Sequence, residues 1–193
     1  MSLVEWEQKN WRLGRGVTLW FTGLPSSGKS TLARALERLF RKKGLPVELL
    51  DGDVVRTHLS KDLGFSREDR DTNVKRIGFV CQLLTSHGVA AVASLVSPYR
   101  DSRDYNRSLI GSFVEIYVKA SADACAKRDV KGLYQKARAG EIKGFTGVDD
   151  PYEEPLAAEI VCDTEHESAE ESLVNILSRL ERLGYLKVSG AAV

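Results

Sequence analysis

Apolar residues are arranged along the chain in two alternating patterns. Short continuous runs rich in β-branched residues are typical of strands buried on both faces of a parallel sheet. These runs lie at 17–22, 47–51, 88–96, 113–120 and 159–164. Between most of them, apolar residues recur at the three- and four-residue spacing of amphipathic helices. The alternation predicts an α/β fold, with a central parallel sheet of about five strands and helices on both faces.

Helical spacing is clearest in three segments, whose ends are marked by polar residues or glycine. The apolar stripes consist of Leu32, Leu36, Leu39 and Phe40, of Val74, Ile77, Cys81 and Leu84, and of Leu173, Ile176, Leu177 and Leu180. Ser66 with Asp69, and Ser168 with Glu171, resemble capping boxes before the second and third stripes. Gly44 is a natural stop for the first. Shorter helices are predicted within 103–111 and 122–129.

Three segments lack this periodicity. Residues 1–15 are expected to form an N-terminal strap with Trp6 and Trp11 as packing anchors. Residues 131–155 have a basic, glycine-rich front half and an acidic end with prolines, which predicts a mobile lid. Residues 187–193 are expected to be a flexible tail.

The length and composition of the chain predict one domain. With 193 residues, of which 42% are hydrophobic, the chain is long enough for one buried core and short for two, so a single domain spanning 1–193 is expected.

Charge and cysteine content exclude several classes of protein. A net charge of +1 lacks the basic excess of a protein whose main partner is nucleic acid, so any anion site must be local. No apolar stretch approaches the roughly 20 residues that span a bilayer, and the N-terminus does not resemble a secretion signal. Cys81, Cys125 and Cys162 are far apart, which argues against a disulfide framework and a zinc site. No membrane partner and a cytoplasmic location are therefore expected.

The stretch GLPSSGKS, residues 23–30, follows a predicted buried strand and precedes a predicted helix. In a loop of this spacing, Gly23 and Gly28 allow backbone N–H groups to turn toward phosphate oxygens, Lys29 adds a positive charge, and the Ser30 hydroxyl is a ligand for Mg²⁺. The following helix directs its positive dipole end to the same anion. This context predicts nucleotide binding on a P-loop nucleoside-triphosphate-hydrolase-like fold. The loop alone does not separate a kinase from a GTPase, an ATPase or a nucleotide sensor.

Two carboxylates, Asp51 and Asp53, end the second predicted strand, where ligands of open α/β sheets bind. In a phosphoryl-transfer site, one such group orients or deprotonates the attacking hydroxyl and another holds metal-bound water. The alternative is a simple turn, because Asp-Gly is strong turn chemistry. The position at the strand end favours a functional role, for Asp53 more than for Asp51.

Cationic and aromatic side chains follow these carboxylates. Arg56 lies one helical turn beyond Asp53, and Phe65 precedes a helix that begins with Arg70 and Asn73 as neighbours on one face. Guanidinium groups bind phosphate or sulfate oxygens, and an aromatic ring beside them could stack on a base. The alternative is that these arginines only pair with acidic neighbours on a solvated face.

Taken together, these stretches resemble the adenylylsulfate kinases, which phosphorylate the 3′-hydroxyl of adenosine 5′-phosphosulfate with ATP. The resemblance rests on GLPSSGKST, LDGD followed by Arg56, LGFSREDRDTN, SPYRDSRD, RDVKGLY and KARAGEIKGFTGVDDPYE. It extends from about Gly16 to the last helix. Val54 departs from the family pattern, which has asparagine at this position.

The resemblance implies a role for each matching residue. Ser26, Ser27, Gly28, Lys29, Ser30 and Thr31 would hold the ATP phosphates with Mg²⁺, to which Asp51 is a second candidate ligand, and Arg128 would lie against the ATP adenine. Lys29, Asp53 and Ser97 are the candidate catalytic residues, with Asp53 at the 3′-hydroxyl of the acceptor. The acceptor would contact Arg56, Phe65, Arg70, Asn73, Val96, Ser97, Lys131, Lys143, Gly144 and Phe145. Ser97 is also a candidate phosphorylated residue, but direct transfer needs no covalent intermediate, which favours a binding role.

The implied activity is the production of 3′-phosphoadenylylsulfate in sulfate activation and assimilation, by an ATP-dependent phosphotransferase acting on an alcohol group. A homodimer and a functional association with a sulfate adenylyltransferase are the implied partners. Two alternatives stay open: another small P-loop kinase acting on a nucleotide or metabolite, and a non-catalytic ATP-binding module. The first has no need for the segment EIKGFTG, and the second could lose Asp53.

Overall fold

A five-stranded sheet forms the middle layer of the protein. The computed structural model describes residues 1–190. The strand order is β3 (Val47–Asp51), β4 (Ala90–Ser94), β2 (Val17–Thr22), β5 (Phe113–Lys119) and β6 (Ile160–Asp163), and every pairing is parallel. All six residues of the central strand β2 are buried, as its continuous apolar run predicted. The predicted parallel sheet flanked by helices is confirmed.

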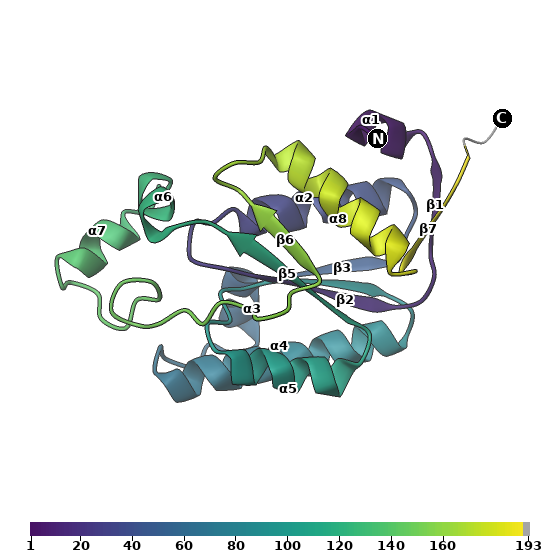
Figure 1. The fold of residues 1–193 in the computed structure, drawn as a ribbon. Coiled ribbons are helices and arrows are strands. Elements are labelled where there is room, and N and C mark those ends of the chain that lie inside the picture. Colours follow the sequence, from purple (N-terminus) through teal and green to yellow (C-terminus); the bar gives the residue numbers. More distant parts are fainter. Residues whose placement is uncertain (191–193) are drawn as a thin grey trace.

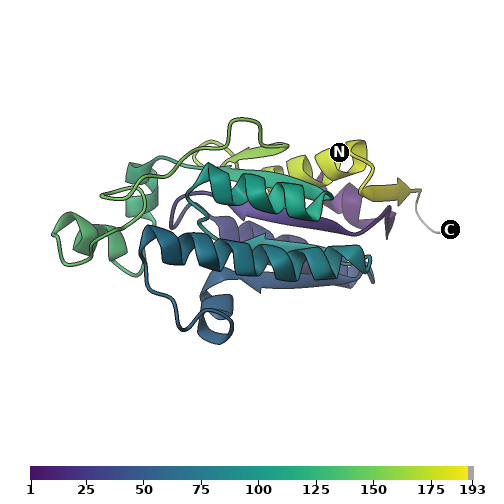
Figure 2. The ribbon, with the colours of Figure 1, turned by 90° about the horizontal axis from the view of Figure 1, so that it is seen from below.

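Helices cover both faces of this sheet, as the ribbon shows (Figure 1). On one face, α2 (Lys29–Lys42) and α8 (Ala169–Arg182) pack against each other. On the other, α4 (Arg67–Ser86) and α5 (Arg100–Ile110) lie side by side (Figure 2). Three shorter helices follow the carboxyl ends of strands or lie beyond them: α3 (Gly52–His58), α6 (Ala122–Lys127) and α7 (Leu133–Arg138). These three helices thus lie at the end of the sheet where the parallel strands have their carboxyl ends.

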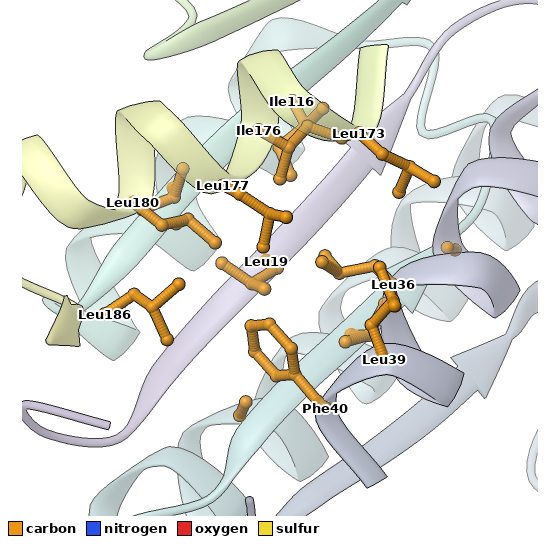
Figure 3. Packing of buried hydrophobic residues seen from close by; sticks show 14 of the residues in the cluster. Leu19, Leu36, Leu39, Phe40, Ile116, Leu173, Ile176, Leu177, Leu180 and Leu186 are labelled. Atoms are coloured by element: carbon orange, nitrogen blue, oxygen red, sulfur yellow. The ribbon is translucent and has the colours of Figure 1, made fainter. Parts of the chain in front are cut away.

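The larger hydrophobic core fills the space between the sheet, α2 and α8. Leu36 and Phe40 of α2 point toward Leu177 of α8 above Leu19 of β2 (Figure 3). A second core lies on the opposite face, where Trp20 of β2 packs at 5.7 Å from the ring of Phe113. Consecutive residues of β2 therefore contribute to opposite cores, and the strand is held from both faces just before the Gly-rich loop.

The predicted helix starts are found at both serines. Ser168 and Glu171 form a reciprocal capping box. The Ser66 hydroxyl accepts a hydrogen bond from the Asp69 N–H. The Asp69 carboxylate, however, accepts from the Gly64 N–H, so Ser66 and Asp69 form half of a capping box. This holds the loop before α4 against the first turn of the helix.

The two ends of the chain pair with each other. After α1 (Leu3–Glu7), strand β1 (Asn10–Leu13) runs antiparallel to β7 (Leu186–Ser189). The prediction of a flexible tail over 187–193 is therefore wrong for residues 187–189. These residues belong to β7, which is held by backbone hydrogen bonds to β1 near the start of the chain. Residues 191–193 lie outside the described residues. Trp6 and Trp11 are buried and pack edge-on at 6.0 Å, which confirms them as packing anchors.

The segment predicted as a lid, 131–155, contains α7 and an isolated bridge between Thr146 and Asp150. Tyr134 of α7 is buried, and its ring meets that of Phe145 edge-on at 4.9 Å. The segment extends beyond the carboxyl ends of the strands, at the left of Figure 1. Its mobility stays a prediction. Within residues 1–190, no helix combines the length and the apolar character needed to cross a bilayer.

Candidate active site

A cavity of about 400 Å³ lies at the carboxyl ends of the strands, between the Gly-rich loop, α3, the start of α4 and the residues after β4. It brings together twelve residues singled out from the sequence: Ser26, Lys29, Ser30, Asp51, Asp53, Arg56, Phe65, Arg70, Asn73, Val96, Ser97 and Lys131. They come from stretches spread over more than a hundred positions of the chain. This convergence at the edge where open α/β sheets bind ligands marks the candidate active site.

The Gly-rich loop has the backbone geometry that its spacing predicted. Gly23 has a φ of 150°, and a Cβ there would lie 2.4 Å from the Val118 carbonyl oxygen, so the neighbouring strand leaves room only for glycine. Gly28, with a φ of 102°, is the N-cap of α2. Ser26 also has a positive φ, of 63°. The loop therefore turns directly into the helix, whose free N–H groups and positive dipole end suit a phosphate.

Lys29, the first residue of α2, is buried beneath this loop. Its ammonium group donates a hydrogen bond to the Leu24 carbonyl oxygen at 2.6 Å. Burial lowers the pKa of Lys29 to about 8, while nearby anionic groups, including Asp53 and Asp51, act in the opposite direction. The side chain is still cationic near neutral pH, and a bound phosphate would favour its charged form further.

The two aspartates differ in their surroundings. Asp51 is buried and caps α3: one carboxylate oxygen accepts from the Asp53 N–H at 3.1 Å and the other from Arg34 at 3.0 Å. The Asp53 side chain is 86% exposed, and it forms an ion pair with Lys131 at 3.1 Å. Asp53 is therefore free to meet a ligand hydroxyl in the cavity, whereas Asp51 also holds α3 in place.

Oxygen donors beside the loop fit a hydrated divalent cation. The Ser30 and Ser94 hydroxyl oxygens lie 3.4 Å apart, and both residues line the cavity with Asp51. Mg²⁺ in nucleotide sites takes one or two protein oxygens and keeps waters and phosphate oxygens as its other ligands. Residues 1–190 contain no cluster of three or more His, Cys, Asp or Glu side chains that would form an all-protein metal cage. The donor set thus fits a cation that arrives with a nucleotide.

Ser97 lies at the floor of the cavity with a left-handed backbone, at a φ of 41°. It is buried, and its hydroxyl accepts from Trp20 Nε1 at 3.1 Å and donates to Thr22 Oγ1 at 3.0 Å. Both hydrogen bonds hold the oxygen within the protein. This arrangement suits a structural support of the cavity better than a nucleophile, and a catalytic role for Ser97 stays a prediction.

Two guanidinium groups flank Phe65 at the other side of the cavity. Arg56 lies over its ring at 4.2 Å, and Arg70 lies at 5.8 Å. Burial and the neighbouring Arg70 lower the pKa of Arg56, while Asp69 and Asp53 act in the opposite direction. Asn73, one turn from Arg70, has a buried Oδ1 with no hydrogen-bond partner among residues 1–190. The two cations suit an anionic group of a ligand, and the unsatisfied Asn73 oxygen suits a hydrogen-bond donor of the same ligand.

Arg70 also joins this pocket to the lid. Its guanidinium donates to the Thr146 hydroxyl at 2.9 Å and to the Gly144 carbonyl oxygen. Its Nε donates to the Phe65 carbonyl oxygen at 2.9 Å. The position of Phe65 and that of the lid therefore depend on one side chain.

The other predicted residues lie outside the cavity lining: Gly23, Ser27, Gly28, Thr31, Arg128, Lys143, Gly144 and Phe145. Arg128 donates to the hydroxyl and the carbonyl oxygen of Thr164, and the Thr164 hydroxyl donates to the Ser27 carbonyl oxygen at 2.9 Å. Arg128 is thus placed beside the Gly-rich loop, on its outer side. Phe145 reaches the loop indirectly, because it packs on Tyr134, whose hydroxyl donates to the Pro25 carbonyl oxygen at 3.0 Å.

Several residues of the site escaped the sequence reasoning. Those that line the cavity are Pro25, Gly52, Val74, Ser94, Leu95, Pro98, Asp129, Val130 and Leu133. Thr164 carried a usable signal, because it is the last residue of the strand predicted over 159–164. Ser94 lies inside the strand predicted over 88–96, and so its place at the cavity could not be told from that prediction. Val54, where the family has asparagine, is 55% exposed and does not line the cavity.

Comparison with known proteins agrees with this geometry. A family model described as adenylylsulphate kinase matches residues 15–163. The chain is 59% identical over 172 residues to a protein of Rippkaea orientalis named adenylyl-sulfate kinase, a match that covers 89% of this chain and 95% of the relative. It is 54% identical over 178 residues to a probable bifunctional SAT/APS kinase of Sorangium cellulosum, covering 92% of this chain and 31% of that relative.

Among solved structures, the APS kinase of Mycobacterium tuberculosis in complex with AMPPNP and APS is similar to this chain. The TM-score is 0.83 at 39% identity, and the match covers 86% of this chain and 98% of that one. The resemblance stated from the sequence motifs is confirmed by these comparisons.

Proposed function

The chain belongs to the adenylylsulphate kinase family and is an ATP-dependent kinase of adenosine 5′-phosphosulfate, and on that premise we propose how its residues divide the work. Asp53 activates the 3′-hydroxyl of the acceptor, opposite a γ-phosphate held by the Gly-rich loop. One observation carries this proposal: an exposed carboxylate lines the same cavity as the cation under the loop and the two guanidinium groups beside Phe65.

Asp53 acts as the base or the orienting group for the attacking hydroxyl. Its carboxylate is exposed and is paired across the cavity mouth with Lys131. An acceptor hydroxyl that approaches Asp53 displaces this exposed ion pair, which costs little because such pairs contribute about 1 kcal/mol or less. Transfer then needs the hydroxyl and the γ-phosphate in line, so positioning supplies much of the rate.

On the donor side, Lys29 neutralises charge on the phosphates, and the start of α2 supplies backbone donors. Mg²⁺ would be held by Ser30, with Asp51 and Ser94 close by, and would neutralise the phosphate oxygens as the phosphoryl group moves. Arg128 is proposed to lie along the adenine of ATP, supported by its place on the outer side of the loop beside Thr164.

On the acceptor side, Arg56, Arg70 and Asn73 are proposed to bind the phosphosulfate, and Phe65 to stack on the adenine. Their support is the two guanidinium groups around Phe65 and the place of Asn73 in the lining of the same cavity. Phe145, Gly144 and Lys143 belong to the lid that excludes water, which prevents hydrolysis of ATP in the open site. Val96 and Ser97 complete the floor.

Partners and location are also proposals. Phe79 and Leu83 lie one turn apart on α4, Tyr105 and Leu109 one turn apart on α5, and all four are exposed on neighbouring helices. Such a face fits a homodimer interface, which sedimentation equilibrium would test. Association with a sulfate adenylyltransferase is suggested by the bifunctional relative. Three buried, unpaired cysteines fit a reducing cytoplasm.

A coupled assay of ATP consumption tests the proposed function. ATP should be consumed only when adenosine 5′-phosphosulfate is present, and 3′-phosphoadenylylsulfate should form in equal amount. Activation by a different nucleotide or metabolite would support another P-loop kinase. No consumption with any acceptor, with ATP binding retained, would support a non-catalytic module.

A further inference from the structure

Arg103 of α5 is a buried cation at the meeting point of three segments. Its side chain is 2% exposed. Nε donates to Glu115 of β5 at 2.7 Å, Nη1 to the Ser97 carbonyl oxygen at 2.6 Å, and Nη2 to the Glu153 carbonyl oxygen at 2.6 Å. One planar group thus binds the sheet, the cavity floor and the C-terminal base of the lid, which neither a lysine nor a neutral side chain could do with the same geometry.

The Ser97 side of this arrangement needs support. Ser97 has a φ of 41°, a conformation that non-glycine residues adopt only when their surroundings impose it. Its hydroxyl is held by Trp20 and Thr22, and its carbonyl by Arg103. Arg103 does not itself line the cavity, whereas Ser97 and Pro98 do. Any effect of Arg103 on a ligand is therefore transmitted through the backbone that it holds.

The lid side is bound to the same place. The Glu153 N–H donates to the Pro98 carbonyl oxygen at 2.8 Å, and the Tyr152 hydroxyl lies 2.9 Å from Thr22 Oγ1. The Arg100 N–H donates to the Glu153 carboxylate at 2.8 Å. The base of the lid and the residues after β4 are therefore joined by several hydrogen bonds. Arg103 and Thr22 each contact both parts directly, and of these two side chains only Arg103 is charged.

We propose that Arg103 is a positioning residue, which fixes the lid base and the Ser97 backbone relative to each other so that the acceptor side of the cavity keeps its shape. This inference rests on the proposed function, which places the acceptor at Val96 and Ser97. The ATP phosphates lie on a loop that Arg103 does not touch. Loss of Arg103 should accordingly affect the acceptor and spare the donor.

Arg103→Lys is the test, because it keeps a positive charge beside buried Glu115 but cannot supply three fixed donors. Arg107→Lys is the matched control. Arg107 lies one turn further on α5, and its side-chain partners within residues 1–190 are Glu115 and Glu159, not Ser97 or the lid. Steady-state kinetics with either substrate varied gives the readout. We expect Arg103→Lys to raise the KM for adenosine 5′-phosphosulfate about tenfold and to change the KM for ATP less than about twofold. Arg107→Lys should leave both within about twofold.

Three results would overturn the proposal: an unchanged acceptor KM in Arg103→Lys, an equal rise in both KM values, or an equal acceptor effect in Arg107→Lys. If Arg103→Lys does not fold, the pair Arg103→Met with Glu115→Gln removes the same bonds without leaving a buried charge unpaired. The same outcomes then decide. Failure of the proposed function is distinguishable, because wild-type protein would then show no acceptor-dependent consumption of ATP.

Discussion

Replacing Lys29 with methionine is expected to stabilise the nucleotide-free fold and to abolish transfer. Lys29 is 7% exposed, and burial lowers its pKa from the ordinary 10.5 to about 8. At about 1.4 kcal/mol per pH unit, this fall destabilises the folded state by about 3 kcal/mol at neutral pH. Methionine has similar length and no charge, but it removes the donor to the Leu24 carbonyl oxygen, a loss of about 1 kcal/mol. The net expectation is a rise of about 2 kcal/mol in the free energy of unfolding.

The pH dependence of this difference has a definite direction. The folded-state pKa of Lys29 lies below the unfolded-state value, so the penalty is fully present below about pH 8. Above about pH 8, Lys29 loses its proton in the folded protein, whereas in the unfolded chain it keeps the proton until about pH 10.5. The penalty for burying the charge therefore falls between these two pH values. Wild-type protein should therefore gain stability relative to Lys29→Met over that interval, and the two should converge.

Urea unfolding followed by tryptophan fluorescence, at about pH 7 and about pH 10 with nucleotide removed, measures this difference. Lys61→Met, the same change at an exposed lysine, controls for general effects of pH and charge. A variant that is less stable than wild type at neutral pH, or a difference that does not depend on pH, would refute the reasoning. The coupled assay should show lost transfer, because the charge over the phosphates is gone.

Three further substitutions examine the two sides of the cavity. Asp53→Ala is expected to reduce transfer at least about 100-fold while ATP affinity, measured by calorimetry, stays nearly unchanged; near-normal turnover would sink the assigned role. Phe145→Ala should raise the KM for adenosine 5′-phosphosulfate more than the KM for ATP, and an equal loss for both would show that the ring is misplaced. Tyr134→Phe removes the donor to the Pro25 carbonyl oxygen, and steady-state kinetics should show a rise of about two- to tenfold in the KM for ATP. An unchanged KM for ATP would mean that this hydrogen bond does not shape the loop.

The sheet could be predicted well because strands of a parallel sheet are buried on both faces, so that their apolar runs are continuous. The runs at 17–22 and 47–51 match β2 and β3 residue for residue. The run at 88–96 is longer than β4, which covers Ala90–Ser94. Its last residues are apolar for another reason: Leu95 and Val96 leave the sheet and line the cavity. An apolar run in the sequence therefore does not show whether its residues belong to a buried strand or line a cavity.

The pairing of β1 with β7 could not be predicted in the same way. Each strand has four residues, and partners such as Trp11 and Val188 lie 177 positions apart in the sequence. A short alternating run carries no information about a distant partner, so residues 187–189 were interpreted as tail. Only the buried Trp11 gave a sign that this end of the chain packs.

In the site, too, local motifs could be predicted, whereas contacts between distant segments could not. Motifs of consecutive residues, such as Gly23 to Ser30, could be predicted because their chemistry depends on local backbone geometry. Arg103 could not, since its three partners come from separate parts of the chain and its helix was interpreted only as polar. Thr164 had a signal in its place at the end of a predicted strand, but its contact with the Ser27 carbonyl oxygen, far away in the sequence, could not be predicted.

The β1–β7 pair also determines where the protein can be joined to something else. Asn10 and Ser189 are register partners, and α1 and β7 lie at the end of the molecule opposite α7 and the lid (Figure 1). A domain fused at either terminus, or a tag used for immobilisation, would therefore leave the entrance of the cavity open. The same proximity makes the chain a candidate for circular permutation, with a short linker across the old ends and new ends cut elsewhere on the surface.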